Sequence, residues 1–232
     1  MGKRIIQQAR GKGSSTYRVS KKAFKYRLQY PPRMIGTAKV LKLVNSSAHS
    51  APLAKVQFEK QIFFIPAFNG MVEGQQIQLG GKEVQKGNIM ALKDLPVKTR
   101  IYCIESRPGD GGRFIKTGGS FATVNRKMGQ EVFILMPSKK EKKMNGNCRA
   151  IVGEIAGSGR VDKPVLKAGK KHHIKKAKSK LWPRTSALKV NAIDHPFGSG
   201  RGKNPKSKIA KRNSPPGAKV GLLRPRRTGK RK

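Results

Sequence analysis

The sequence predicts an all-β protein: two small barrels flanked by extended basic arms. Three observations favour this fold class. Apolar residues in the middle of the chain alternate with polar ones over short runs, turns rich in Gly and Asn separate those runs, and the positive charge gathers at the two ends. Short strands spaced by roughly 8–12 residues are typical of barrels and sandwiches rather than of helical bundles.

The predicted strands form two series. A break near Gly87–Asp94 divides them into two compact units, each the size of a small barrel. The "NG" at 69–70 and the "PGDGG" at 108–112 are examples of the turns between strands. The first series comprises 36–45, 53–59 and 61–68, and the second comprises 100–106, 113–117, 120–127, 131–137 and 148–156.

The charge of the chain indicates its class of partner. The 232 residues carry 53 Lys and Arg against 11 Asp and Glu, a formal net charge of +42. Residues 1–33 have ten basic and no acidic residues, 34–159 have nineteen and nine, and 160–232 have twenty-four and two. Self-repulsion of this size opposes compaction, so a polyanion is expected to supply the missing charge. Nucleic acid is the strongest candidate, because neutralising phosphates releases condensed counterions.

The C-terminal arm, 160–232, contains few apolar residues and many Gly and Pro. Such a segment cannot offset a backbone ordering cost of about 1–2 kcal/mol per residue by burial, so we expect it to be largely disordered alone and to order against RNA.

Other classes of protein are disfavoured. The N-terminus lacks the apolar core of a secretory signal, and the longest apolar runs, such as "IFFIPAF", are too short to span a bilayer, so no membrane is expected. Cys103 and Cys148 form neither a disulfide framework nor a CxxC pair, which indicates a reduced intracellular compartment. Both lie in apolar strand-like segments and are expected to be buried.

The segment "NAIDHPFGSGRG" (191–202) pairs an acid with a histidine in a basic region. One interpretation is catalytic, because an Asp can orient a His and raise its basicity. Against it, neighbouring side chains of an extended segment point in opposite directions, and the GxSxG nucleophile motif is lacking.

We favour a structural interpretation of this loop. Asp194 is expected to bond backbone amides two residues on, in an Asx-type turn into Pro196. His195 would bond a base edge, a phosphate or a 2′-hydroxyl, or stack on a base as Phe197 would. Three glycines would let the backbone approach a ligand surface without Cβ clashes: Gly198, Gly200 and Gly202.

Two further motifs have alternative interpretations. "HHIKK" contains His172 and His173 but has no suitably spaced Cys, Asp or Glu, so nucleic-acid contacts are favoured over a metal site. Trp182 is either a hydrophobic anchor onto the barrels, which we favour, or a stacking platform beside Arg184.

Three stretches resemble the archaeal form of the universal large-subunit ribosomal protein L-two family. They are "GKRIIQQARGKGSSTYR", "GEIAGSGRVDKPVLKAGKKHHIKKAKSKLWPR", and "VNAIDHPFGSGRG" followed by "RNSPPGAKVG" and "RRTGKRK". The resemblance covers essentially the whole chain. It implies an OB-fold barrel followed by an SH3-like barrel, with both termini running into ribosomal RNA. The segments expected on this basis are 1–33 (basic extension), 34–86 (OB-fold-like barrel), 87–160 (SH3-like barrel) and 161–232 (rRNA-binding region).

The resemblance also has departures. Ser199 stands where the family usually has another glycine, and "LKVNAIDH" replaces the more usual "VAMNAVDH". The family's loop histidine, which would be His195, has been proposed to assist peptide-bond formation. We expect RNA packing there instead, because the neighbouring sequence offers no catalytic apparatus.

The function expected from the resemblance is structural and non-enzymatic. The chain would be a cytoplasmic, primary rRNA-binding constituent of the large ribosomal subunit. It would stabilise rRNA near the peptidyl transferase centre and support subunit association, tRNA binding and peptide-bond formation. Expected partners are large-subunit rRNA, neighbouring ribosomal proteins, small-subunit rRNA as a bridge and nearby tRNA, with no small-molecule substrate.

The rival functions are a histone-like nucleic-acid-compacting protein and an enzyme using Asp194 and His195. No cofactor is expected beyond Mg²⁺ held through rRNA phosphates, and no catalytic or metal-binding residue. The residues predicted to contact RNA are Lys3, Arg4, Arg10, Lys12, Arg18, Lys170, Lys171, His172, His173, Lys175, Lys176, Trp182, Arg184, Asn191, Asp194, His195, Pro196, Gly198, Gly200, Arg201, Arg212, Arg224, Arg226 and Arg227.

Overall fold

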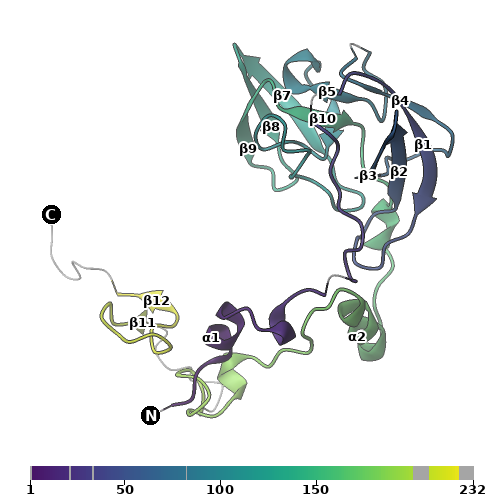
Figure 1. Cartoon of the computed structure of the whole chain (residues 1–232). Coiled ribbons are helices and arrows are strands. Elements are labelled where there is room, and N and C mark those ends of the chain that lie inside the picture. Colours follow the sequence, from purple (N-terminus) through teal and green to yellow (C-terminus); the bar gives the residue numbers. More distant parts are fainter. Residues whose placement is uncertain (1, 21, 33, 82, 201–208, 225–232) are drawn as a thin grey trace, which may run out of the picture. The chain divides into compact units, whose positions relative to one another are not determined.

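The computed structural model describes residues 2–20, 22–32, 34–81, 83–200 and 209–224, and Figure 1 shows their elements. The chain divides into two compact units. We call Ser20–Lys167 the globular unit, and Met1–Val19 together with Ala168–Lys232 the terminal unit.

The globular unit confirms the all-β prediction. Its strands join in one hydrogen-bonded order, β3-β2-β1-β4-β5-β10-β6-β7-β8-β9, in which the neighbours pair antiparallel except for β4 and β5. The strands are β1 (Gly36–Val44), β2 (Leu53–Phe58), β3 (Gln61–Pro66), β4 (Gln76–Leu79), β5 (Ile89–Ala91), β6 (Arg100–Tyr102), β7 (Ala122–Met128), β8 (Glu131–Leu135), β9 (Glu141–Asn145) and β10 (Arg149–Val152). Short 3₁₀ turns lie at Leu92–Asp94 and Ser158–Arg160.

A β-bulge explains an irregularity of the first strand. Along β1 the alternation is interrupted by two adjacent apolar residues, Val40 and Leu41. The pairing register with β2 shifts between Val40 and Lys42, so Leu41 is the extra residue. The extra residue shifts the alternation of side chains by one position. Without the bulge, every side chain after Leu41 would point to the opposite face of the sheet.

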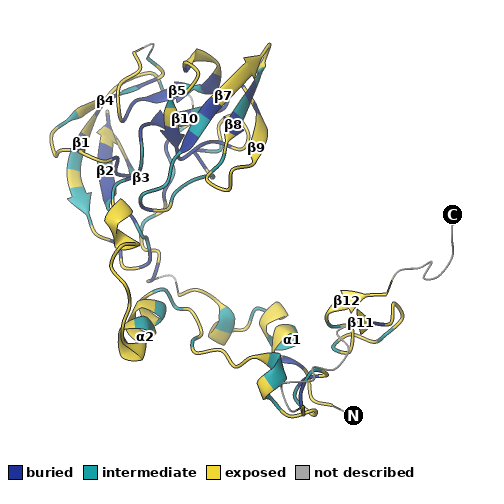
Figure 2. Cartoon of the chain, turned by 180° about the vertical axis from the view of Figure 1, so that it is seen from behind, coloured by how far each residue is buried: buried dark blue, intermediate teal, exposed yellow. Residues whose placement is uncertain are grey.

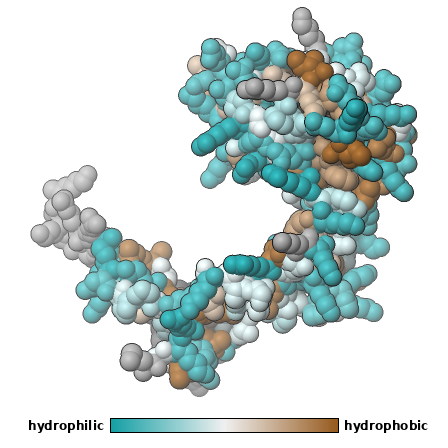
Figure 3. All heavy atoms as spheres, in the orientation of Figure 1, coloured by the Kyte–Doolittle hydropathy of each residue, from teal (hydrophilic) through white to brown (hydrophobic). Residues whose placement is uncertain are grey.

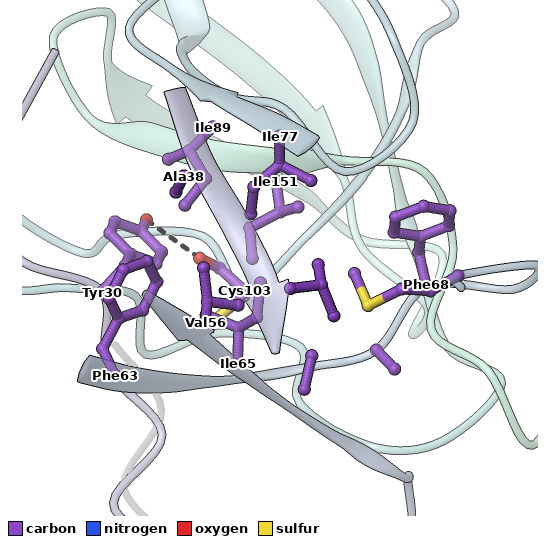
Figure 4. Packing of buried hydrophobic residues seen from close by; sticks show 14 of the residues in the cluster. Tyr30, Ala38, Val56, Phe63, Ile65, Phe68, Ile77, Ile89, Cys103 and Ile151 are labelled. Carbon is purple, nitrogen blue, oxygen red and sulfur yellow. Dashed lines mark hydrogen bonds between the residues drawn. The ribbon is translucent and has the colours of Figure 1, made fainter. Parts of the chain in front are cut away.

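The strands enclose two hydrophobic cores, as expected for an OB-fold barrel followed by an SH3-like barrel. Figure 4 shows side chains of the first core, among them Val56, Ile65 and Ile151. The second core contains Met90, Val124 and Ile134. Ile89 packs in the first core and Met90 in the second, because successive side chains of β5 point to opposite faces. The four predicted segment boundaries remain predictions.

Part of the predicted basic extension belongs to the first core. Tyr30 is 1% exposed, and its hydroxyl donates to the carbonyl oxygens of Cys103 (3.0 Å, dashed in Figure 4) and Arg149 (2.9 Å). The guanidinium of Arg149 bonds the carbonyl of Pro31 (2.9 Å) and the fully buried carboxylate of Glu105 (3.0 Å). A buried ion pair with all its hydrogen bonds made is costly to break. This network therefore fixes the segment before β1, which contains Tyr30 and Pro31, onto the barrels.

The structure corrects the strand predicted at 113–117. Only an isolated bridge between Ile104 and Phe114 forms there. Ile115 has φ of +58°, a left-handed conformation that a strand does not admit. Strands β4, β5 and β9 were not predicted. Residues 87–94, where the sequence predicts a break, contain β5, which pairs with β4 and β10.

The terminal unit has little apolar burial. Its described elements are α1 (Ile6–Gly11), α2 (Ala168–Ala177), the 3₁₀ turns Ser15–Tyr17 and Ala187–Lys189, and the short parallel pair β11 (Ile209–Ala210) and β12 (Leu222–Leu223). Figure 2 shows α2 and most of this unit without dark-blue buried residues. Among its described residues the buried hydrophobic side chains are Ile5 and Ala210. No helix formed by the described residues is long and apolar enough to cross a membrane.

Candidate nucleic-acid interface

The charged residues of the terminal unit are almost all cationic. Its sequence has five Lys and Arg in 1–19 and twenty-one in 168–232, against one acidic residue, Asp194. Figure 3 shows hydrophilic side chains over most of the visible face of its described part. The described part of this unit therefore offers positive charge with little competing negative charge.

The N-terminal segment meets the loop 191–199 within this unit. The backbone N–H of Lys3 donates to the carbonyl of Ile193 at 2.8 Å. The Lys3 Nζ lies 3.8 Å from the Asp194 Oδ1, and both side chains are well exposed. Such an exposed ion pair contributes little on its own, so the backbone bond is the firmer link. A Cβ on Gly2 would stand 3.2 Å from the Ile193 carbonyl oxygen, which shows how closely the segments pass.

A groove of about 520 Å³ lies between these segments. Its walls combine long cationic side chains with an apolar lining, a mixture suited to phosphates and to the flat faces of sugars and bases. The cations are Lys3, Arg4, Arg10 and Arg184, and the apolar residues are Ile6, Leu181, Pro183, Ala187 and Val190. Asp194 and His195 complete the lining together with Gln7 and Thr185. The apolar lining was not predicted, because single apolar residues in a basic segment carry no periodicity.

The loop 191–199 is held by its own backbone. The amides of Asp194 and His195 both donate to the Asn191 carbonyl, at 3.0 and 3.2 Å. The Gly198 amide donates to the His195 carbonyl at 2.8 Å, and the Ser199 amide to the Val190 carbonyl at 3.0 Å. These bonds close the loop into a compact turn that presents Asp194 and His195 to the groove.

His195 supports the turn from inside. Its side chain is 6% exposed, and its Nδ1 accepts the Phe197 amide at 3.0 Å. A ring nitrogen that accepts a bond from a backbone N–H carries no proton, so the hydrogen of the neutral ring lies on Nε2. The Phe197 ring lies 5.1 Å from it, centroid to centroid, tilted by 59°. The imidazole of His195 thus accepts a hydrogen bond from the backbone of its own loop and stabilises the loop.

The Asx-type turn predicted for Asp194 is wrong. The amide two residues beyond Asp194 would belong to Pro196, which has no N–H. The side-chain-to-amide bond instead runs one residue later, from Phe197 to His195. The carboxylate of Asp194 is left for Lys3.

Gly198 and Ser199 occupy two demanding positions. A Cβ on Gly198 would come within 2.3 Å of the Asn191 carbonyl oxygen, so only glycine fits. Its close approach is to the loop's own backbone, whereas the sequence predicted an approach to a ligand. Ser199 has φ of +57°, where a side chain is strained. A Cβ on Gly200 would meet nothing within 4 Å.

Helix α2 lacks a buried face. It carries Lys170, Lys171, Lys175 and Lys176, of which Lys171 and Lys175 are half-buried and the others exposed. The rings of His172 and His173 lie 5.6 Å apart, and that of His172 lies 6.4 Å from Trp182. Trp182 thus contacts α2 within the terminal unit, and neither its predicted contact with the barrels nor its stacking on RNA is tested.

The remaining predicted residues are dispersed. Lys12 and Arg18 are exposed after α1, Asn191 and Pro196 are exposed in the loop, and Arg212 donates to the carbonyl of Arg224 at 3.4 Å beside β11 and β12. Arg201, Gly202, Arg226 and Arg227 lie outside the described residues. Their contacts with RNA, like those of the whole predicted set, stay predictions.

Metal-ligand clusters are also lacking where the structure is described: no group of three or more His, Cys, Asp and Glu side chains converges there. Both cysteines are buried and unpaired, as predicted. Burial raises the pKa of Cys103 to about 12 and that of Cys148 to about 11, so both thiols stay protonated and are poor ligands.

Comparison with known proteins identifies the family. Residues 85–217 match the profile of the family described as "Ribosomal Proteins L2, C-terminal domain". The chain is 42% identical over 238 residues to the "Large ribosomal subunit protein uL2" of Archaeoglobus fulgidus, across the whole of both chains.

The chain belongs to the ribosomal protein L2 family. A protein of the same name from Methanococcoides burtonii is also 42% identical, over 241 residues and again across both whole chains. The resemblance to the archaeal form of the family is therefore confirmed. As a member of a ribosomal protein family, this L2-family chain is a structural component and not a classical enzyme.

Proposed function

We propose that this chain is a structural constituent of the large ribosomal subunit in the cytoplasm, and that it binds rRNA mainly through its terminal unit. Its full-length relatives are named for that subunit. The observation that carries the rRNA contact is the charge of the terminal unit, where the one acidic residue, Asp194, already faces Lys3. Nothing in the sequence of this unit balances the other cations, so phosphates are their natural partners.

The proposed roles within the ribosome follow from this contact. The chain would be a primary rRNA-binding protein that stabilises rRNA folding near the peptidyl transferase centre. By fixing that RNA it would support subunit association, tRNA binding and peptide-bond formation. Neighbouring ribosomal proteins, a small-subunit rRNA bridge and nearby tRNA are the proposed further partners. Magnesium would share the interface through rRNA phosphates rather than through protein ligands.

Salt dependence tests the electrostatic contact. We expect the affinity of the full chain for large-subunit rRNA to fall steeply with salt. In a plot of log affinity against log salt concentration, each neutralised phosphate should add about 0.7–0.9 to the negative slope. Filter binding at several KCl concentrations measures the slope. A slope near zero would refute the mechanism. Competition with duplex DNA separates the histone-like alternative, which predicts that DNA displaces the protein as well as folded rRNA does.

The role of His195 can be tested by two matched variants. In His195→Asn the side-chain Oδ1 can replace Nδ1 as acceptor for the Phe197 amide, while the titratable ring is lost. His195→Ala loses both. We expect subunits reconstituted with the Asn variant to assemble and form peptide bonds nearly as the wild type does, and the Ala variant to lose both functions together. Normal assembly with peptide-bond formation lost in both variants would instead indicate a direct chemical role.

A further inference from the structure

The dipeptide Asn-Gly occurs twice in the globular unit, as Asn69–Gly70 and as Asn145–Gly146. Asparagine is a thermolabile residue. It is most labile before glycine, because glycine has no side chain to hinder the attack of its own amide nitrogen on the asparagine side chain. Both asparagines are exposed and both glycines lie in turns, so the two sites differ mainly in what holds the glycine amide.

The amide of Gly146 is held by the fold. It donates to the Gln130 carbonyl at 2.8 Å, and Gly146 is buried. Asn145 pairs with Glu131 across β9 and β8, and its side-chain Oδ1 accepts the Asn147 amide at 2.9 Å. Attack by the Gly146 nitrogen would require this end of the hairpin to open first, so the folded chain should protect Asn145.

The amide of Gly70 is open to reaction. It makes no hydrogen bond with any residue that the structure describes, and Gly70 is exposed. A Cβ on Gly70 would meet nothing within 4 Å. The turn is closed by a bond from the Met71 amide to the Phe68 carbonyl, 3.2 Å long, which leaves the nitrogen between them unengaged. The Gly70 nitrogen therefore needs no opening of a backbone bond of its own before it attacks Asn69.

We propose that Asn69 is a site of spontaneous deamidation in the folded protein, whereas Asn145 is protected. The deprotonated Gly70 nitrogen attacks the Asn69 Cγ, the bond between Cγ and Nδ2 breaks, and Nδ2 leaves as ammonia with the proton that Gly70 lost. Water then opens the resulting cyclic imide at either carbonyl. The products at position 69 are aspartate and isoaspartate, and isoaspartate carries one extra carbon in the backbone.

The modified turn belongs to a link within the globular unit. The Asn69 amide donates to the Glu154 carbonyl at 3.0 Å, and the Ala156 amide donates to the Ala67 carbonyl at 2.9 Å. The Asn69 Nδ2 also donates to the Glu154 Oε1 at 3.4 Å. Deamidation replaces that donor by a carboxylate, so two like charges then face each other. Both products should therefore weaken the link, and this inference does not depend on the proposed rRNA contact.

The experiment compares the two sites within one sample of the full chain. The protein is aged at neutral pH and digested at acidic pH, where deamidation is slow. Mass spectrometry of the two Asn-Gly peptides measures conversion, and methyl transfer by an isoaspartyl methyltransferase measures the isoaspartate. Because reaction at Asn145 requires local opening, we expect conversion at Asn69 to be faster by roughly tenfold or more.

Two controls separate the fold from the dipeptide. In urea the two sites should convert at similar rates, because both asparagines precede glycine and neither amide is held. In the folded chain Asn69→Gln should abolish most of the isoaspartate, because the longer side chain cyclises poorly, and the matched variant Asn145→Gln should leave it unchanged. Equal conversion of the two sites in the folded chain, faster conversion at Asn145, or an Asn69 that stays intact on ageing would overturn the proposal.

The effect on the link is tested by Asn69→Asp, which introduces the carboxylate of one product. We expect a lower urea midpoint of the β-sheet circular dichroism than in the wild type, and a smaller drop when Glu154→Gln is present in both compared chains. Asn145→Asp is the matched control, because its carboxylate can still accept the Asn147 amide, and it should leave the midpoint nearly unchanged. A midpoint unaltered by Asn69→Asp would refute the weakening of the link.

Discussion

At the scale of single residues, the loop 191–199 depends on one position without a side chain. Gly198 passes so close to Asn191 that a Cβ would lie 2.3 Å from its carbonyl oxygen and 2.5 Å from that of Val190. Both contacts are with backbone, which cannot rotate away. The loop must therefore open if any side chain is introduced at this position.

Gly198→Ala should accordingly weaken rRNA binding, while Gly200→Ala should not. Overpacking of this kind costs about 1–3 kcal/mol, which corresponds to a loss of affinity of roughly 5- to 150-fold. Gly200 has open space around it and serves as the matched control. Filter binding to large-subunit rRNA measures both variants. Equal affinities for the two would show that the loop does not have the described backbone.

We expect His49 to make the stability of the globular unit depend on pH. Burial and the charge of Lys116 lower the pKa of His49, so the unfolded chain binds its proton at a higher pH than the folded one. The free energy of unfolding should therefore fall as the pH drops below about 6.5, the ordinary pKa of histidine, and stop falling once the folded form is also protonated.

The measurement is the urea midpoint of the β-sheet circular dichroism between pH 7.5 and 5. His49→Asn keeps a side-chain partner for Ser46 but cannot titrate, so the variant should lose this part of the pH dependence. Identical pH profiles of variant and wild type would assign the dependence to other groups.

The residues of the loop could be predicted from the sequence, but their roles only in part. The motif indicated a structural turn, and His195 does support one. The side chain expected to make the bond was Asp194, but Pro196 has no amide hydrogen to donate, so His195 makes the bond to the Phe197 amide instead. The close approach at Gly198 and the left-handed Ser199 come from three-dimensional contacts between 190–191 and 198–199, which no local pattern reveals.

At the scale of elements, strands of five or more residues with alternating apolar residues were predicted, whereas the short strands β4 and β5 and the strongly charged strand β9 were missed. β1, β2, β3, β7 and β8 lie within or close to their predicted ranges. β9 has one buried residue, Met144, among charged ones, and β5 has only three residues. Both are strands because their neighbours pair with them, a tertiary effect that overrides weak local preference.

Helix α2 was missed for a similar reason, since its helical turns carry lysines rather than an apolar stripe. Lys171 and Lys175 are four residues apart on one face, and like charges at that spacing destabilise a helix by about 0.2–0.5 kcal/mol. A helix without a buried face gains little from packing. We infer that phosphates between these lysines stabilise it.

The double variant Lys171→Gln/Lys175→Gln should therefore form α2 more readily without RNA and bind rRNA less salt-dependently, with the log–log slope reduced by about one for each lost phosphate contact. The ¹³Cα shift of Ile174 measures the helix in the full chain. Lys163→Gln/Lys167→Gln removes the same charge at the same spacing from exposed positions outside α2, so it should leave the Ile174 shift unchanged. Equal effects of both pairs on that shift would contradict a role for repulsion within α2.

At the scale of the whole molecule, the two units are ordered by different forces. The globular unit encloses two hydrophobic cores and a buried ion pair between Glu105 and Arg149. In the described part of the terminal unit, Ile5 and Ala210 are the buried hydrophobic residues. Backbone ordering costs about 1–2 kcal/mol per residue, so these two side chains cannot hold the unit together against its charge. Composition alone predicted this contrast, because both apolar content and charge can be counted along the sequence.

Amide hydrogen exchange of the full chain, alone and bound to large-subunit rRNA, tests most directly whether the partner orders the terminal unit. The amides of β2, β7 and β8 should be protected in both states. Those of α2 and of the loop 191–199 should exchange nearly as fast as unfolded peptide without RNA, and at least tenfold more slowly with it. Terminal-unit amides that are as well protected without RNA as those of the β-strands, and unchanged by its addition, would contradict the account.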